Sequence, residues 1–262
     1  MGREDCETEC TYHLELDKIE APLSDLIRKY GITEYIRDYY AALNGYLKIQ
    51  YAEEDFYIAE DVTCQPWFTV MGIVPEKMTE ERLRELLLPY IASDRYIAVC
   101  TNIEQVSGLL EKQEVFTYHE NFWVASIGQA EKVDCEDIRL ATVEDLPFIE
   151  KTYRRSGHQQ LLNRIQAEEF WIAASGTEIK GYAGIHKDGS LGFEYVAEKY
   201  RRQHVGSRLQ NFVADYMIKN NRLPYVMISE ANSVGVNLQK KMGAHFADEM
   251  CYFYAKGPYE LE

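Results

Sequence analysis

The stretch Leu191–Leu209, LGFEYVAEKYRRQHVGSRL, decides the fold of this chain. Its first residues are aromatic or β-branched, as is typical of a strand. From Val205 onward the apolar residues change to helical spacing. These apolar residues are Val205, Leu209, Phe212, Val213, Tyr216 and Met217. The sequence therefore predicts a strand, a loop and a helix in direct succession.

The loop of this unit is basic and rich in hydrogen-bonding groups. It consists of Arg201, Arg202, Gln203, His204, Val205, Gly206 and Ser207. The helix that follows directs its unpaired N–H groups and the positive end of its dipole at the loop, which favours a phosphate or pyrophosphate. Gly206 would let the backbone approach such an anion, and the two arginines could pair with its oxygens. Basic residues before a helix are, however, more often a solvated surface than a ligand site.

Two motifs together resemble the GNAT acetyltransferases. The loop resembles the family's acetyl-CoA loop, Arg-x-x-Gly-x-Gly/Ala after a strand that ends Val-x-x-x-Tyr, although His204 replaces the first glycine. The segment Asn232–Gly243 resembles the family's Asn-x-x-Ala-x-x-Leu-Tyr-x-Lys-x-Gly, with Gln239 at the tyrosine position. The resemblance covers residues from about Val133 to Lys256. The two motifs together are more specific evidence for this resemblance than either motif alone.

The resemblance implies a cofactor site between two parallel strands, Phe193–Val196 and Tyr225–Ser229. The backbone of Glu194, Tyr195 and Val196 would pair with the pantetheine arm, and the Val196 N–H would polarise the thioester carbonyl. Glu194 is the first candidate for the base that deprotonates the acceptor amine, and Glu230 is the second. Either could act through water, and each could also be a solvent-facing residue.

Three further residues carry open alternatives. Asn232 would hold a cofactor amide or cap the last helix, and both roles are compatible. Gln239 cannot protonate the departing thiolate, but a thiol with a pKa near 8.5 is a tolerable leaving group without full protonation. His204 would bind a phosphate or point to solvent.

Composition limits the class of protein. The chain has 262 residues, six cysteines without a disulfide framework and a formal net charge of -15, which opposes nucleic-acid binding. The net negative charge of the protein suits a cationic substrate. A net charge of this kind is also a common means by which a protein stays soluble.

No apolar run reaches transmembrane length and the start MGREDCETEC is not a signal peptide, so we expect a cytoplasmic protein without a membrane partner. Cys6, Cys10 and His13 match no common zinc spacing, so we assign no metal.

Internal similarity divides the chain. Val74-Pro75-Glu76-Lys77 precedes a predicted helix as Val196-Ala197-Glu198-Lys199 does, and a similar order of elements follows each. We therefore expect an α+β fold of tandem GNAT-like mixed sheets flanked by helices, with a degenerate domain over residues 1–130 and a GNAT acetyltransferase domain over 131–262. The first copy has Glu80 and Glu81 at its helix start, which would repel a pyrophosphate. Only the second copy should bind CoA.

The expected function is that of an acetyl-CoA-dependent N-acetyltransferase. Acetyl-CoA would be the co-substrate, and the acceptor would be a small-molecule or peptide amine whose identity and pocket depend on variable loops. The sequence does not fix the oligomeric state. One alternative is a non-catalytic acyl-CoA-binding regulatory module, favoured by Gln239. The other is transfer of a different acyl group.

Overall fold

The computed structural model describes residues 13–61, 68–91, 104–114, 116, 118–247 and 250–254. The strand predicted over Tyr96–Cys100 lies outside these residues, as do Cys6 and Cys10. Within the described residues no helix is long and apolar enough to cross a membrane.

The first half begins with two helices and a three-stranded sheet. Their bounds are η1 Leu16–Lys18, α1 Ala21–Tyr30, η2 Thr33–Tyr35, α2 Ile36–Leu43, β1 Leu47–Glu53, β2 Phe56–Asp61, β3 Phe68–Gly72, α3 Glu80–Ile91 and α4 Glu104–Leu110. The sheet is antiparallel in the order β1-β2-β3. Gly31 ends α1 with a φ of 96°, a conformation that glycine adopts without steric cost, and so separates the two helices.

A larger sheet and its flanking helices follow from Tyr118 onward. Its elements are β4 Tyr118–Ser126, β5 Ile138–Leu140, η3 Val143–Asp145, α5 Leu146–Thr152, α6 His158–Gln166, β6 Phe170–Ser175, β7 Glu178–Ile185, β8 Leu191–Val196, η4 Glu198–Tyr200, α7 Val205–Lys219, β9 Tyr225–Ser229, α8 Ser233–Lys241, β10 His245–Phe246 and β11 Met250–Tyr254. The strand order is β10-β4-β9-β8-β7-β6-β5, and β11 also pairs with β4. The β6–β7–β8 run is antiparallel, whereas β8 and β9 are parallel.

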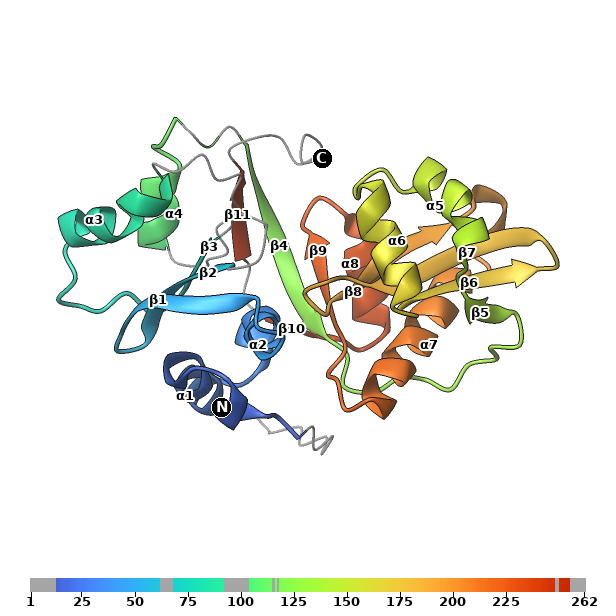
Figure 1. Ribbon diagram of the computed structural model, residues 1–262, viewed down its shortest axis with the longest axis horizontal. Helices are drawn as coiled ribbons and strands as arrows, with labels where there is room; N and C mark the ends of the chain where they lie inside the picture. Colours follow the sequence, from blue (N-terminus) through green and yellow to red (C-terminus); the bar gives the residue numbers. More distant parts are fainter. Residues whose placement is uncertain are drawn as a thin grey trace.

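Strand β4 joins the two halves. It precedes residue 131 in the chain, yet it lies between β9 on one side and β10 and β11 on the other (Figure 1). Its residues Phe122–Ser126 pair in register with Ser229–Tyr225 of β9. The larger sheet therefore combines β4, which lies within residues 1–130, with strands that lie within residues 131–262. The division of the chain into these two domains stays a prediction.

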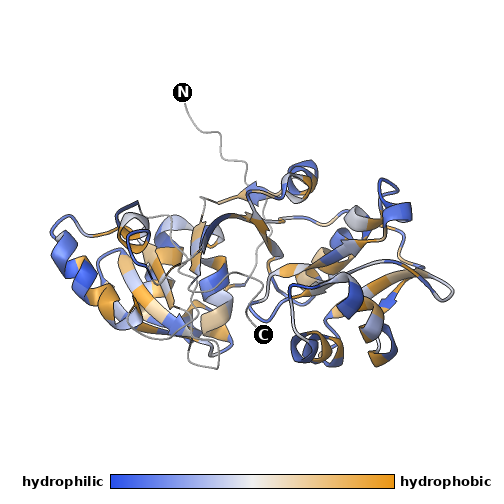
Figure 2. Ribbon diagram, turned by 90° about the horizontal axis from the view of Figure 1, so that it is seen from above, coloured by the Kyte–Doolittle hydropathy of each residue, from blue (hydrophilic) through white to orange (hydrophobic). Residues whose placement is uncertain are grey.

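Helices cover both faces of the larger sheet because its strands are apolar on both sides. On one face, Val205, Leu209, Val213 and Met217 of α7 pack into a cluster with β6, β7, β8 and β9. On the other, α5 and α6 contribute to a cluster that includes Phe170, Tyr182 and Phe193. Hydrophobic residues follow the strands, and hydrophilic residues gather on the outer sides of the helices (Figure 2). The predicted α+β class, with sheets flanked by helices, is confirmed.

A third cluster fixes the first half against the second. Tyr40 of α2 stacks on Tyr225 of β9 with ring centroids 5.9 Å apart, and its hydroxyl accepts a hydrogen bond from the Leu223 N–H at 2.7 Å. The cluster also holds Val124 of β4 and Met250 of β11. Because α2 covers β9 directly, the two halves share apolar core.

Candidate active site

The two parallel strands of the sheet separate soon after they meet. Leu191 of β8 is in register with Val226 of β9, and within the described residues this is the one register pair that joins the two strands. From there β8 continues beside β7 as far as Val196, while β9 continues beside β4 as far as Ser229. We call the gap between Gly192–Val196 and Met227–Ser229 the splay. The two strands therefore diverge at the place where the sequence predicts the cofactor site.

A β-bulge interrupts the pairing of β8 with β7 beside the splay. The register with β7 shifts between Tyr182 and Gly184, and Phe193 has a φ of 50°, which is uncommon for a residue other than glycine. The Phe193 ring is held in place by His186, whose ring centroid lies 3.9 Å away. Gly192 makes this possible, because a Cβ there would lie 2.2 Å from His186 Nε2. The bulge places Glu194 between two residues, Phe193 and Tyr195, that both pack toward α5 and α6.

Glu194 has the electrostatics of a base. Desolvation raises the pKa of its carboxyl group from 4.5 to about 7. The side chain is nevertheless exposed to solvent, so a proton can reach the carboxyl group from water. The charge of Glu194 also acts on Tyr153 at the end of α5, which places the start of the α5–α6 loop beside it.

The basic loop leads from β8 into α7. Arg201, Arg202, Gln203 and His204 are exposed, and the Arg201 Nε donates a hydrogen bond to the Val196 carbonyl at 3.2 Å. His204 is the N-cap of α7 with a φ of 61°, the conformation for which the motif's first glycine is suited. Ser207 Oγ donates to the His204 carbonyl at 3.1 Å. A Cβ at Gly206 would meet only the Val196 side chain, at 3.4 Å, so the first turn of α7 is open at this position.

The residues after β9 occupy different environments. Glu230 is exposed, and its N–H donates to the Asn121 carbonyl of β4 at 2.9 Å. Asn232 Oδ1 accepts from the Gly235 N–H at 3.0 Å, so this side chain caps α8 as one of the two alternatives predicts. Gln239 is buried on α8, with 2% of its surface exposed. The structure thus brings Glu194–Val196, the loop and α8 around one splay, with Glu230 at its edge.

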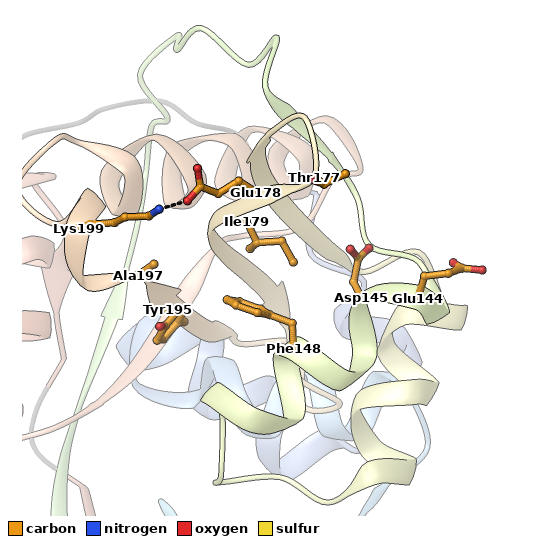
Figure 3. A pocket seen from close by; sticks show the side chains of 9 residues that line it. All are labelled: Glu144, Asp145, Phe148, Thr177, Glu178, Ile179, Tyr195, Ala197 and Lys199. Carbon is orange, nitrogen blue, oxygen red and sulfur yellow. Dashed lines mark hydrogen bonds and ion pairs between the residues drawn. The ribbon is translucent and has the colours of Figure 1, made fainter.

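A cavity of about 480 Å³ adjoins β8 on the side of α5. Phe148, Ile179 and Tyr195 converge on it, and the Lys199–Glu178 ion pair closes one side (Figure 3). The other lining residues are Glu144, Asp145, Thr177 and Ala197. Asp145 is neutralised by Arg139 at 2.7 Å, whereas Glu144 is exposed. The cavity therefore combines an apolar floor with an acidic rim.

Residues 131–249 match the family model described as "Acetyltransferase (GNAT) domain". The second half of this chain is a GNAT domain. The resemblance predicted from the loop and from Asn232–Gly243 is thereby confirmed for this half. No curated protein is significantly similar to the chain in sequence.

Solved structures of the same fold extend over both halves. A Drosophila protein matches with a TM-score of 0.63 at 12% identity, covering 94% of this chain and 97% of its own. A GNAT-family acetyltransferase from Colwellia psychrerythraea matches with a TM-score of 0.52 at 13% identity, covering 92% and 93%. A GCN5-related N-acetyltransferase from Kribbella flavida matches with a TM-score of 0.52 at 9% identity, covering 87% and 97%. At these identities the similarity shows the fold alone.

Two features beside Glu194 were not predicted from the sequence. The bulge at Phe193 and its support by His186 have no local sequence signal, because a positive φ outside glycine depends on tertiary packing. Tyr153, on which the charge of Glu194 acts, was not singled out from the sequence either.

Proposed function

We propose that the protein is an N-acyltransferase that uses acetyl-CoA or a related acyl-CoA to acylate an amine. The observation that carries the proposal is Glu194, a carboxylate with a raised pKa at a bulge beside the splay. A general base is most effective when its pKa lies near the working pH, and the pKa of about 7 satisfies this condition.

The residues present fit the expected co-substrate. The open first turn of α7, with Arg201 and Arg202 exposed beside it, would hold the pyrophosphate. Gln203, His204 and Ser207 would add hydrogen bonds at the rim. The backbone of Glu194, Tyr195 and Val196 would hold the pantetheine arm along the splay, since β9 diverges from β8 beyond Leu191. Asn232, which caps α8, would contact the same arm from the side of β9.

Each residue then has a defined chemical role. Acetyl-CoA supplies the thioester whose acyl group the amine nitrogen takes, with CoA released as the thiolate. Glu194 accepts the proton that the amine loses, directly or through one water molecule. The Val196 N–H donates a hydrogen bond to the carbonyl oxygen on which charge develops. Gln239 replaces the tyrosine that the family resemblance leads us to expect, so this chain relies on the low basicity of the thiolate rather than on a proton donor.

The cavity beside Tyr195 is the proposed location for the remainder of the acceptor. Tyr195, which lines the cavity, directly follows Glu194 in β8. Its apolar floor suits a hydrocarbon or aromatic group, and the exposed Glu144 on the rim suits a positive charge. A compound with two amino groups separated by an apolar spacer combines these features.

Turnover separates this proposal from an acyl-CoA-binding module. The full-length protein would be incubated with acetyl-CoA and pools of primary amines, diamines and short peptides, and thiol release would be measured. Amine-dependent release that Glu194→Gln abolishes supports the enzyme. Tight binding of acetyl-CoA without release from any pool would favour the binding module.

A further inference from the structure

The ring of His186, just beyond the end of β7, occupies the space beside Gly192 of β8. The three heavy atoms nearest to a Cβ built on Gly192 all belong to this ring. They are Nε2 at 2.2 Å, Cδ2 at 2.5 Å and Cε1 at 3.4 Å. Gly192 does not have a positive φ, so its backbone conformation is open to other residues. The close approach of the His186 ring is therefore what requires a glycine at this position.

The same ring supports the bulge in β8. Its centroid lies 3.9 Å from that of Phe193, nearer than the rings of Tyr153 at 5.3 Å and Phe170 at 5.4 Å. Phe193 is buried with a φ of 50°, a conformation that a bulky residue keeps only when its surroundings impose it. Burial lowers the pKa of the His186 imidazole, so the ring that packs on Phe193 is uncharged near pH 7.

The bulge sets the position of Glu194. Strands β7 and β8 pair at Gly184–Gly192 and again at Tyr182–Tyr195. Between these pairs β8 has Phe193 and Glu194, whereas β7 has only Ala183. The extra residue determines on which face of the sheet the side chains after the bulge lie relative to those before it. A change in the backbone of Phe193 would therefore move Glu194 directly.

His186 is held in turn by the hairpin between β7 and β8. Its carbonyl accepts a hydrogen bond from the Gly189 N–H at 2.9 Å. The Tyr225 hydroxyl of β9 donates to the Asp188 carbonyl at 2.7 Å, and a Cβ at Gly189 would lie 3.3 Å from the Tyr40 ring of α2. The backbone that carries the His186 ring therefore rests on β9 and on a helix of the first half.

We propose that His186 is a positioning residue for catalysis, because its ring holds Phe193 in the bulge and thereby keeps Glu194 where it can take the proton of the acceptor amine. This inference rests on the proposed function. His186 acts through Phe193 and not on the substrate, and Gly192 is the complementary requirement that leaves room for the ring. A displacement of about 1 Å in a reacting group can lower turnover by about a hundredfold, so a packing contact at this distance from the chemistry is sufficient.

A double-mutant cycle between Gly192 and His186 tests this inference. Gly192→Ala, His186→Ala and the double variant would be compared with the full-length parent in acetyl-CoA affinity, by calorimetry, and in turnover of an amine that the parent acylates. We expect Gly192→Ala to lower kcat by about tenfold or more, because the added methyl group displaces the ring. The dissociation constant of acetyl-CoA should stay within about twofold of the parent. In the His186→Ala background, Gly192→Ala should have no further effect on kcat, since the ring it would displace is absent.

The pH–rate profile provides a readout that a general loss of stability would not change. In His186→Ala the acidic limb should lie at lower pH than in the parent, because a Glu194 that has left the bulge is less desolvated and its pKa falls toward 4.5. His186→Phe should restore kcat to within about threefold of the parent, since it keeps a ring on Phe193. Loss of turnover in both variants would overturn positioning by packing and assign the role to the imidazole nitrogens.

Gly128→Ala and His158→Ala are the matched controls. A Cβ at Gly128 would meet no described heavy atom within 4 Å, and His158 is exposed and pairs with Glu150 at 2.6 Å, so both variants should behave as the parent. Thermal midpoints would identify a variant that does not fold, and His186→Leu replaces His186→Ala in that case. An unchanged kcat and acidic limb in His186→Ala would overturn this inference alone. A parent that acylates no amine would overturn the proposed function, and this inference with it.

Discussion

Leu191 of β8 and Val226 of β9 mark the point from which the site opens. They are in parallel register, and within the described residues the two strands share no second register pair. Each of the two strands is also paired with an antiparallel neighbour. Strand β8 pairs with β7, and β9 pairs with β4. The gap between them is therefore maintained by the rest of the sheet and does not depend on a ligand.

Gly206 should be essential for binding acetyl-CoA. A large side chain at the first turn of α7 would occupy the space in which we place the pyrophosphate, since a Cβ at this position already meets Val196 at 3.4 Å. We expect Gly206→Trp to abolish the rise in thermal midpoint that acetyl-CoA produces in the parent. Gly108→Trp in α4 is the control, because Gly108 has no heavy atom among the described neighbours within 4 Å. An unchanged thermal shift in Gly206→Trp would contradict the assignment of the loop.

Glu194→Gln should separate binding from catalysis. Glutamine preserves the size of the side chain and the backbone contacts, so affinity for acetyl-CoA should be unchanged. Turnover should fall by about a hundredfold or more, because the amine loses its base. In the parent, activity should decline as the pH falls through about 7, where the carboxylate becomes protonated, and this limb should be absent from the variant. Glu230→Gln is the control, and a similar loss in that variant would move the base to Glu230.

The same carboxyl group should affect stability as a function of pH. Its pKa is raised from 4.5 to about 7 in the folded protein, so between these values the folded state binds more protons than the unfolded state. The contribution of Glu194 to stability is therefore present below about 4.5 and is lost as the pH rises toward 7. We expect Glu194→Gln to gain in denaturation midpoint relative to the parent over this interval. A constant difference between the two proteins across the interval would show that the pKa of Glu194 is not raised.

The GNAT domain should not be stable when it is expressed from Val133 onward. Such a fragment lacks β4, which pairs with β9 over five residues on one side and with β10 and β11 on the other. Its removal would leave the apolar strand β9 as an open edge, which favours aggregation. It would also uncover the face of Tyr225 that stacks on Tyr40. A monomeric, fully active fragment in gel filtration and turnover assays would refute this expectation; a fragment that starts before Tyr118 is the comparison.

The sequence alone determined the local units and the identity of the loop. The strand character before the loop and the helical spacing from Val205 are short-range features, and β8 and α7 are found where they were predicted. The Arg201–Ser207 loop could be found because its chemistry depends on consecutive residues at one helix start. Glu194 could be singled out only through the family resemblance, since an isolated glutamate in a strand has no distinctive pattern.

The tertiary structure decided how these units form a site. The insertion of β4 beside β9 joins residues about a hundred positions apart, and no periodicity along the chain encodes such a pairing. The positive φ of Phe193 requires the His186 ring above Gly192, and the raised pKa of Glu194 results from the atoms that surround its carboxyl group.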